Sequence, residues 1–559
     1  MTASFRPCTK WITSVSIRSS IPLFLAAALL VACHPDEVVE EAARLRSVSV
    51  TETALVLPEG GQALLHFKVQ DPGYPLDLRV GDSRGSVSLT LFDGSAPQYV
   101  RLTEVRADGA AGSYIATLQD RGDNDFQEDV YLRVRSSEGS VVTAPRVAVQ
   151  GSAFQEQEQL LVDTGLPVVI VDTQGGRAVN SKETFVPGTV RIQGVGSWDG
   201  LAETGCEIRG RGNTTWTWPK KPYLLKLTEK QHVFGMHKHK RWVLLANFMD
   251  RTLMRNLVSM KVASMMSNLA WTPGCVPVEL VLNGRHMGSY LLIEQVRVDN
   301  HRVAITEMTP EDNTGDAVTG GYLLELDFHY DNPVQWTDPH GHNNQWGNGI
   351  PFGVKYPDPD EITPQQVNYI KGYISEAANT LYGNDFKDPD KGYAKYIDVD
   401  SFIDYWIVFE VMGNHELGNP GSVFMHKDRG GKLVAGPCWD FDWGVLSYNT
   451  SPQARTGLVN GSAIWYGRLR QDPAFEAKLK ARFNELLPQL ETIPDYMDEC
   501  EKLLKASAGL NFAMWNPAED ASQNGGRIIN GDENMSFHDA VARLKAIYKE
   551  RLKVIPTKL

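Results

Sequence analysis

Hydrophobic and polar residues alternate in short runs along the early part of the chain. SVSVTETALVL (47–57), ALLHFKV (63–69), SVSLTLF (86–92) and VYLRVRS (130–136) are such runs, and Gly, Pro, Asp and Ser separate them. Alternation with a period of two places successive side chains on opposite faces of a β-strand. The pattern predicts an all-β immunoglobulin-like sandwich over residues 47–150, acting as a spacer or interaction module.

The pattern changes after a polar linker at residues 150–159. LPVVIVDT (166–173) is a continuous apolar run, typical of a buried strand, and TVRIQGV, YLLKL and RWVLLANF are further strand candidates. The run VPVELVLNGRHMGSYLLIEQV contains an Asn283-Gly284 pair, which favours a tight hairpin turn. A strand-rich part is therefore expected from residue 160 onward.

Helical spacing of apolar residues appears three times in the same part of the chain. Asp250 is expected to be the N-cap of a helix over residues 251–270, and further helices are expected over 365–411 and from Asp472 to the end. Residues 338–349 are predicted to form a mobile loop at the mouth of a cleft. The fold class predicted for the whole chain is α+β.

The N-terminus resembles an export signal. Arg6, Lys10 and Arg18 precede an apolar run from Ile21 to Val31, which is too short to span a bilayer comfortably. The run ends in LVAC, which resembles a bacterial lipobox, so residues 1–33 are expected to be a lipoprotein signal with Cys33 lipidated. A short anchor or a buried segment is the alternative.

This resemblance implies a location as well. We expect a cell-envelope protein, an outer-membrane lipoprotein that is periplasmic or surface-exposed and is held at the membrane by the lipid on Cys33. HPDEVVEE (34–41) resembles export tags of Bacteroidetes lipoproteins, although it would serve equally as a solvated tether.

Charge and cysteine content argue against a nucleic-acid partner and against a zinc site. The net charge is −13, so the chain as a whole does not attract nucleic acid, and no nucleic-acid partner is expected. Cys206, Cys275, Cys438 and Cys500 lie far apart without CxxC spacing, which argues against a zinc site.

Residues 436–444, GPCWDFDWG, place two aspartates one residue apart between aromatic rings. Residues two apart in an extended segment project from the same face, so Asp440 and Asp442 could converge on one cation. Oxygen ligands in this small number suit Mg²⁺, which also binds water and substrate phosphate. A glycosidase pair normally draws its two carboxylates from different elements, so the metal interpretation is preferred.

RGRGNTTWTWPKKPYLLKL (209–227) is a second candidate for chemistry. Its glycines permit close approach of a ligand to the backbone, and exposed amides in such a turn can hold phosphate oxygens. Arg209 and Arg211 could contact phosphate, and Lys226 points away from Leu225 and Leu227 in its strand. A solvated set of basic residues is the alternative.

Five motifs in order give the chain a specific resemblance. RGRGNTTW with KKPYLLKL, NFMDRTLMRN, the VELVLNGRHMGSYLLIEQV hairpin, GNHE and GPCWDFDWG resemble the spore coat protein H (CotH) kinase family, over about Leu166 to the final helices. The resemblance implies an atypical protein-kinase-like bilobal domain over residues 160–559, which binds ATP and Mg²⁺ between a strand-rich and a helical lobe.

The resemblance also implies roles for individual residues. Asp440 would correspond to the metal-binding aspartate of kinases, and Asp442 would supply or support a second ligand. Lys226 is the first choice for the phosphate lysine and Lys221 the second. Glu294 matches a position near the nucleotide, although a buried salt bridge would explain it equally well.

The chain departs from the family pattern at residues 414–416. The family carries Asn-x-Asp some two dozen residues before the Trp-Asp-x-Asp motif, and this chain has Asn414-His415-Glu416. Glu416 keeps the charge but reaches one methylene further, so it could act as a base or support the metal with altered geometry.

Two functions are therefore expected to compete. The first is an exported kinase that transfers the γ-phosphoryl group of ATP to a protein hydroxyl with Mg²⁺. The second is an inactive kinase-fold surface lipoprotein that binds a glycan or a protein.

Overall fold

The structure is a computed structural model, and it describes most of the chain. The apolar run 21–31 and Cys33 lie outside the described residues, so the prediction of a lipidated signal stays a prediction. The described residues are 45, 47–58, 60–70, 77–81, 87–92, 97–122, 126–136, 139–151, 158–329, 332–343, 347–517 and 529–559.

The chain forms two compact units. The first ends at Val149, and the second runs from Gln150 to Leu559 and includes the short stretches 93–98 and 124–128. Each unit is described by itself below. No helix among the described residues combines the length and the apolar character that crossing a membrane requires.

The first unit contains two sheets. One has the strand order β1-β3-β7-β6 and the other the order β2-β10-β8-β5-β4, with β9 paired to β8. In β8 every second side chain is buried, including Val130, Leu132 and Val134, which is the alternation that the sequence shows. The strands are β1 (Ser47–Val50), β2 (Ala54–Leu57), β3 (Gln62–Gln70), β4 (Leu78–Val80), β5 (Val87–Phe92), β6 (Val100–Ala107), β7 (Ser113–Asp120), β8 (Gln127–Arg135), β9 (Val141–Thr143) and β10 (Val147–Gly151).

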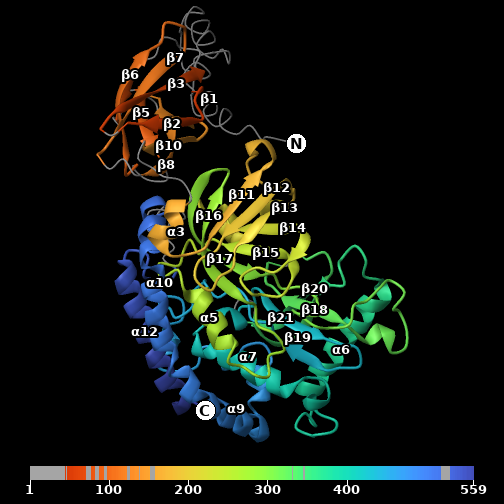
Figure 1. Cartoon of the computed structure of the whole chain (residues 1–559). Coiled ribbons are helices and arrows are strands. Elements are labelled where there is room, and N and C mark those ends of the chain that lie inside the picture. Colours follow the sequence, from red (N-terminus) through yellow and green to blue (C-terminus); the bar gives the residue numbers. More distant parts are fainter. Residues whose placement is uncertain are drawn as a thin grey trace, which may run out of the picture. The chain divides into compact units, whose positions relative to one another are not determined.

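The second unit begins with a closed barrel of strand order β11-β12-β13-β14-β15-β17-β16 (Figure 1). Antiparallel pairs make up most of the barrel, and a parallel pair between β11 and β16 closes it. Asn283 and Gly284 both have positive φ, which confirms the predicted hairpin turn between β16 and β17. The strands are β11 (Val168–Thr173), β12 (Val186–Gln193), β13 (Leu201–Gly210), β14 (Tyr223–Gln231), β15 (His239–Leu245), β16 (Cys275–Leu282) and β17 (Arg285–Glu294).

The barrel has a filled interior and an outer face that packs against the rest of the unit. Leu225 and Leu244 belong to the core inside the barrel. Leu224, Val243 and Ile293 point the other way and join the large core of the helix-rich part. One face of β14, β15 and β17 therefore rests on the second half of this unit.

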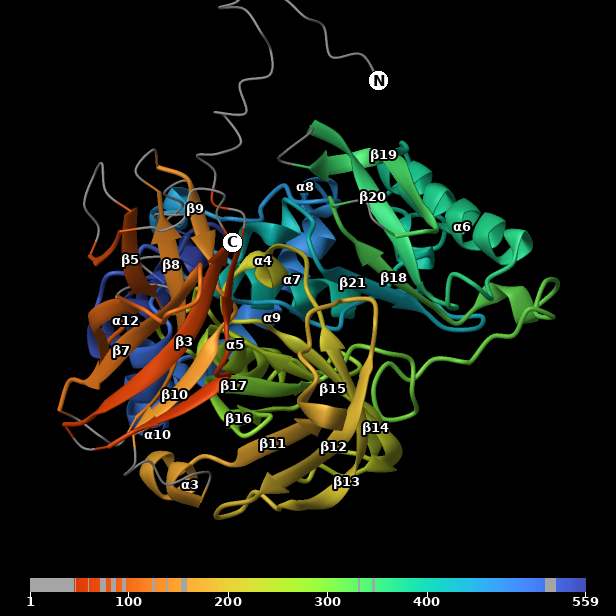
Figure 2. The ribbon, with the colours of Figure 1, turned by 90° about the horizontal axis from the view of Figure 1, so that it is seen from above.

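The helix-rich part is built around a five-stranded sheet of order β19-β20-β18-β21-β22. Helix α6 lies beside the β19–β20 pair (Figure 2). The strands are β18 (Tyr322–Leu326), β19 (Gln335–Asn343), β20 (Gly347–Tyr356), β21 (Val423–Lys427) and β22 (Leu433–Ala435). The α-helices of this unit are α3 (Glu158–Thr164), α4 (Thr214–Thr217), α5 (Arg255–Ala263), α6 (Pro364–Tyr382), α7 (Val399–Val411), α8 (Tyr466–Leu469), α9 (Pro473–Leu490), α10 (Ile493–Met514) and α12 (Phe537–Val554).

The mixture of sheets and helices confirms the α+β class. Two local predictions were wrong. Asp250 is not the N-cap of α5, because the helix begins at Arg255 with Met254 at the cap, and the Asp250 carboxylate instead accepts hydrogen bonds from Thr252 and Arg255. The stretch 338–349 is not a loop in its described part, since Gln335–Asn343 and Gly347–Tyr356 pair as antiparallel strands.

Candidate functional site

The acidic segment, residues 436–447, follows β22 and carries Asp440 and Asp442. Phe441, between the two aspartates, is fully buried against Phe409, with ring centroids 4.7 Å apart. Asp440 and Asp442 remain partly exposed. The buried aromatic rings therefore hold the segment in place, and the carboxylates between them remain accessible to a ligand.

The backbone at Asp440 adopts an uncommon conformation. Its φ is 64°, in the left-handed region, which Asp tolerates better than most residues but which still costs free energy. Ser422, whose φ is 55°, donates its hydroxyl to Asp440 Oδ2 at 3.4 Å. Such conformations persist only where the surroundings hold them.

The two aspartates make it less favourable for each other's carboxyl group to be ionised. Burial raises the pKa of Asp440, and the guanidinium of Arg211 opposes that rise. Burial and the neighbouring Asp440 carboxylate raise the pKa of Asp442 to about 8. The acids thus lack enough positive charge nearby, and a divalent cation would offset the deficit.

Glu416 lies within electrostatic reach of Asp440 and Asp442. Its backbone N–H donates to the side chain of Asn414 at 2.9 Å, at the start of the short 3₁₀ turn η5 (His415–Leu417). Burial, followed by the charges of Asp440, Asp442 and Asp327, raises the pKa of Glu416 well above its ordinary value. The structure therefore brings Asn414 and Glu416 together with the acidic segment.

Asp327, directly after β18, was not singled out in the sequence. It bonds to His329 Nδ1 at 2.8 Å, and it adds to the negative charge around Asp440 and Glu416. The Leu-Asp-Phe triplet that contains it looks like an ordinary strand end. Only the pairing of β18 with β21 shows that this strand end lies at the site.

Of the two arginines at the end of β13, Arg211 approaches the site. Burial lowers the pKa of Arg211, while Asp440 and Asp442 oppose that change, so the guanidinium lies within electrostatic reach of both acids. Its Cζ is 5.5 Å from the centre of the Trp439 ring. Arg209 instead lies over Phe185, at 5.0 Å from the ring centre.

The remaining candidates are bonded to other groups of the protein, in the barrel or next to it. Lys226 Nζ forms a half-exposed ion pair with Glu207 at 2.8 Å, and Lys221 Nζ donates to the Trp216 carbonyl at 2.8 Å. Glu294 is 5% exposed, and it accepts from the Gly274 N–H at 2.9 Å and pairs with Arg302 at 3.5 Å. The salt-bridge alternative for Glu294 thus has a partner in the structure.

The donor set suits a cation that takes few protein ligands. In the part of the chain that the structure describes, no group of three or more His, Cys, Asp or Glu side chains has a metal-binding arrangement. Mg²⁺ commonly binds one or two carboxylates and completes its shell with water and phosphate oxygens. Asp440 and Asp442 fit that chemistry, with Glu416 close by.

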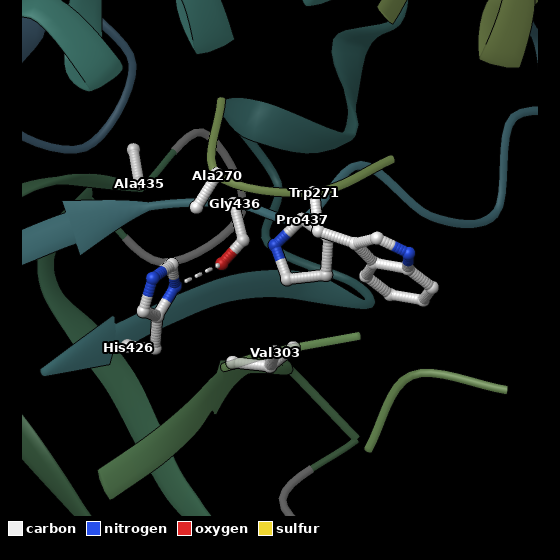
Figure 3. Close-up of a pocket in the computed structure, with 7 residues that line it drawn as sticks. All are labelled: Ala270, Trp271, Val303, His426, Ala435, Gly436 and Pro437. Atoms are coloured by element: carbon white, nitrogen blue, oxygen red, sulfur yellow. Dashed lines mark hydrogen bonds between the residues drawn. The ribbon is translucent and has the colours of Figure 1, made fainter. Parts of the chain in front are cut away.

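A small pocket lies at the beginning of the acidic segment and is a different place (Figure 3). His426 Nδ1 lies 3.2 Å from the Gly436 carbonyl oxygen and donates to it. The pocket has a volume of about 10 Å³, room for about one water molecule. Its lining residues are Ala270, Trp271, Val303, His426, Ala435, Gly436 and Pro437.

Comparison with known families gives a match over most of the second unit. A family model described as CotH kinase protein matches residues 208–555, which run from β13 to the C-terminal helix α12 and include the acidic segment. Comparison with the curated proteins found no match.

Proposed function

This chain belongs to the CotH kinase family, and from that premise we propose that it is a Mg²⁺-dependent atypical protein kinase, which transfers the γ-phosphoryl group of ATP to a protein hydroxyl. The barrel and the helix-rich part would be the two lobes of a kinase-like domain. The proposal draws support from the outer barrel face, whose apolar residues join the core of the helix-rich part.

The observation that carries the proposal is the convergence of three acids and one arginine. The charges of Asp440 and Asp442 raise the pKa of Glu416, and Arg211 lies within electrostatic reach of both aspartates. Phosphoryl transfer requires positioning and charge neutralisation more than covalent help from the protein. Carboxylates that can hold a metal ion, opposite the guanidinium of Arg211, could supply both the positioning and the charge neutralisation.

Each side chain has a defined task in this proposal. Asp440 and Asp442 would hold Mg²⁺, which would neutralise charge on the phosphates when it is bound. Arg211 would bind phosphate oxygens from the opposite side. Glu416 would accept the proton of the acceptor hydroxyl, and Asn414 fixes the Glu416 backbone through the hydrogen bond to its N–H.

The basic residues of the barrel have weaker claims. Arg209 and Lys226 share a face with the ring of Phe185, and a phosphate chain could reach them after Lys226 leaves Glu207. Lys221 donates to the backbone of α4, and Glu294 accepts from Gly274 and pairs with Arg302, so we assign both residues to structural support.

Transfer of label tests the proposal directly. Purified protein is incubated with γ-labelled ATP and Mg²⁺, with and without added acceptor proteins. We expect label on protein, and we expect Asp440→Ala to abolish it. Asp400→Asn is the control, because Asp400 on α7 forms a half-exposed ion pair with Lys478 of α9, and its substitution should not affect transfer. Absence of both transfer and metal-dependent nucleotide binding in the unaltered protein would refute the kinase proposal.

A second candidate function has a specific observation in its favour. Lys226, the first choice for a phosphate lysine, is engaged by Glu207, and Glu416 stands where the family has Asp. An inactive kinase-fold protein that binds a glycan or another protein would need neither group. A glycan or protein ligand found without any nucleotide dependence would support this candidate.

We also propose that the protein is exported and anchored through a lipid on Cys33, in the cell envelope. The support is the apolar run 21–31 and the LVAC sequence that ends at Cys33. Metabolic labelling with a radioactive fatty acid should mark the unaltered protein and leave Cys33→Ala unlabelled.

A further inference from the structure

Asparagine side chains from two other parts of the chain hold the backbone of the acidic segment. Asn256 of α5 accepts the Phe441 N–H through Oδ1 at 2.7 Å. Asn530 accepts the Gly444 N–H at 2.9 Å and donates to the Asp442 carbonyl at 3.3 Å. Both asparagines are almost completely buried. Their bonds lie on both sides of the Asp442 side chain and directly after Asp440.

The orientation of each amide is fixed by a further bond. Asn530 Nδ2 also donates to the Met249 carbonyl at 2.9 Å, and Asn256 Nδ2 donates to Asn247 Oδ1 at 3.3 Å. An amide whose donor and acceptor are both engaged cannot flip without losing bonds in a buried site. The two asparagines therefore present their acceptors to the acidic segment in one orientation.

An ion-paired arginine ties the same three parts of the chain together. Arg255, beside Asn256, is 1% exposed and pairs with Asp250 and with Asp532. Its Nε donates to the Val445 carbonyl at 2.9 Å. Glu533 accepts the Asn530 N–H at 2.7 Å. Asn256 and Asn530 are thus fixed in turn by the ion pairs of Arg255 and by the hydrogen bond to Glu533.

The acidic segment requires such support for two reasons. Asp440 has a φ of 64°, in the left-handed region, which costs free energy for a residue with a side chain. Asp440 and Asp442 also repel each other at short range. Without outside contacts, the segment would relax toward ordinary φ values and turn the carboxylates apart.

We propose that Asn256 and Asn530 are positioning residues, which hold the carboxylates of Asp440 and Asp442 in the orientation that binds a divalent cation together with a nucleoside triphosphate. The identity of this ligand rests on the proposed function, whereas the holding of the segment does not. Neither asparagine bonds to a carboxylate of the pair, so both act through the backbone.

Two readouts on the full chain test this inference. Hydrogen exchange of residues 438–447 is measured in metal-free protein, and Mn²⁺ affinity in the presence of ATP is measured by electron paramagnetic resonance. Asn256→Leu and Asn530→Leu should speed exchange of this segment and weaken Mn²⁺ binding about 10–100-fold, as loss of groups that support metal ligands commonly does. Asn256→Asp keeps the acceptor for the Phe441 N–H and should keep exchange slow.

Asn511→Leu is the matched control. Asn511 is 2% exposed and bonds to Lys220 and to the Ser289 N–H, away from the acidic segment. Its loss should lower stability without faster exchange at residues 438–447. Should a leucine variant fail to fold, Asn256→Ser and Asn530→Ser replace it, because a hydroxyl keeps the site polar but is too short to make the same bonds.

The outcomes separate this inference from the proposed function. Exchange in the Asn256 and Asn530 variants that equals exchange in the Asn511 control overturns the inference, even where the protein is an active kinase. Faster exchange with unchanged Mn²⁺ affinity overturns it as well. If the unaltered protein binds no Mn²⁺ with ATP, the proposed function fails, and the exchange data alone decide whether the asparagines hold the segment.

Discussion

The indole rings of Trp218 and Trp443 stack with centroids 6.0 Å apart and an angle of 6° between their planes. Trp218 follows α4 in the glycine-rich region after β13, and Trp443 follows Asp442 in the acidic segment. The stack therefore joins the barrel region that carries Arg211 to the segment that carries the two aspartates.

Removal of this stack should loosen the site. Trp443→Leu keeps an apolar side chain but loses the ring contact, which is worth about 0.5–1.5 kcal/mol beyond burial. We expect Trp443→Leu to have a lower melting temperature and weaker phosphoryl transfer than the unaltered protein. Trp443→Phe should lie between Trp443→Leu and the unaltered protein in both measurements. Equal melting temperatures for the Leu and Phe variants would show that the ring contact contributes nothing. Calorimetry and the label-transfer assay provide the measurements.

Lys220 should contribute strongly to the stability of the folded protein, although it is not part of the acidic site. It is completely buried, and its Nζ donates to the Ala246 carbonyl at 2.9 Å, to Asn511 Oδ1 at 2.7 Å and to the Ser289 carbonyl. Burial lowers its pKa to about 7. Three acceptors need three N–H groups, which only the ammonium form has.

Lys220→Met should therefore lower the free energy of unfolding by about 3 kcal/mol, because the substitution leaves buried acceptors without a donor. Lys226→Met is the comparison, since a half-exposed ion pair is worth less than about 1 kcal/mol. Chemical denaturation measures both. Equal losses for the two variants would contradict the role given to Lys220.

The charge of Glu416 should matter more than its size. Glu416→Gln removes the group that accepts the proton, and we expect kcat to fall about 10²–10⁴-fold with the KM for ATP nearly unchanged. Glu416→Asp retains a carboxylate at a shorter reach and should retain more activity than the Gln variant. A Gln variant with normal kcat would exclude Glu416 as the base. Because burial and neighbouring acids raise the pKa of Glu416, the rate should also rise with pH.

Stability of the metal-free protein should depend on pH through Asp442. The pKa of Asp442 is raised to about 8 in the folded protein, and an unfolded Asp has a pKa near 4. Between these values the folded state binds more protons, so this contribution to stability is full at low pH and is lost as pH rises from about 4 to about 8. Asp442→Asn should gain stability relative to the unaltered protein as pH rises, which melting curves from pH 5 to 9 would reveal.

Mg²⁺ or Mn²⁺ should reverse this loss. Binding of the cation must displace the proton, so the rise in melting temperature on addition of the metal should be larger at pH 8.5 than at pH 6. Asp442→Asn should remove most of the difference. A shift that is independent of pH would argue against Asp442 as a ligand.

The local patterns of the sequence determined much of this protein. Alternation with a period of two located the strands of the first unit, and Asn283-Gly284 specified a hairpin turn because both residues tolerate positive φ. The WDFD stretch marked two acids as candidates for the site, since carboxylates between aromatic residues are unusual. These features depend on neighbours along the chain, so they are visible without a structure.

Only the tertiary structure decided which distant groups meet. The parallel pair of β11 and β16 closes the barrel across about a hundred residues, and no local pattern encodes such a pairing. The sequence predicts Asp250 as a helix cap, but the structure pairs it with the buried Arg255, and no local pattern places Asn530 beside Asp442. The physical reason is that the value of a polar side chain is set by burial and by the partners that surround it, and these come from packing rather than from spacing along the chain.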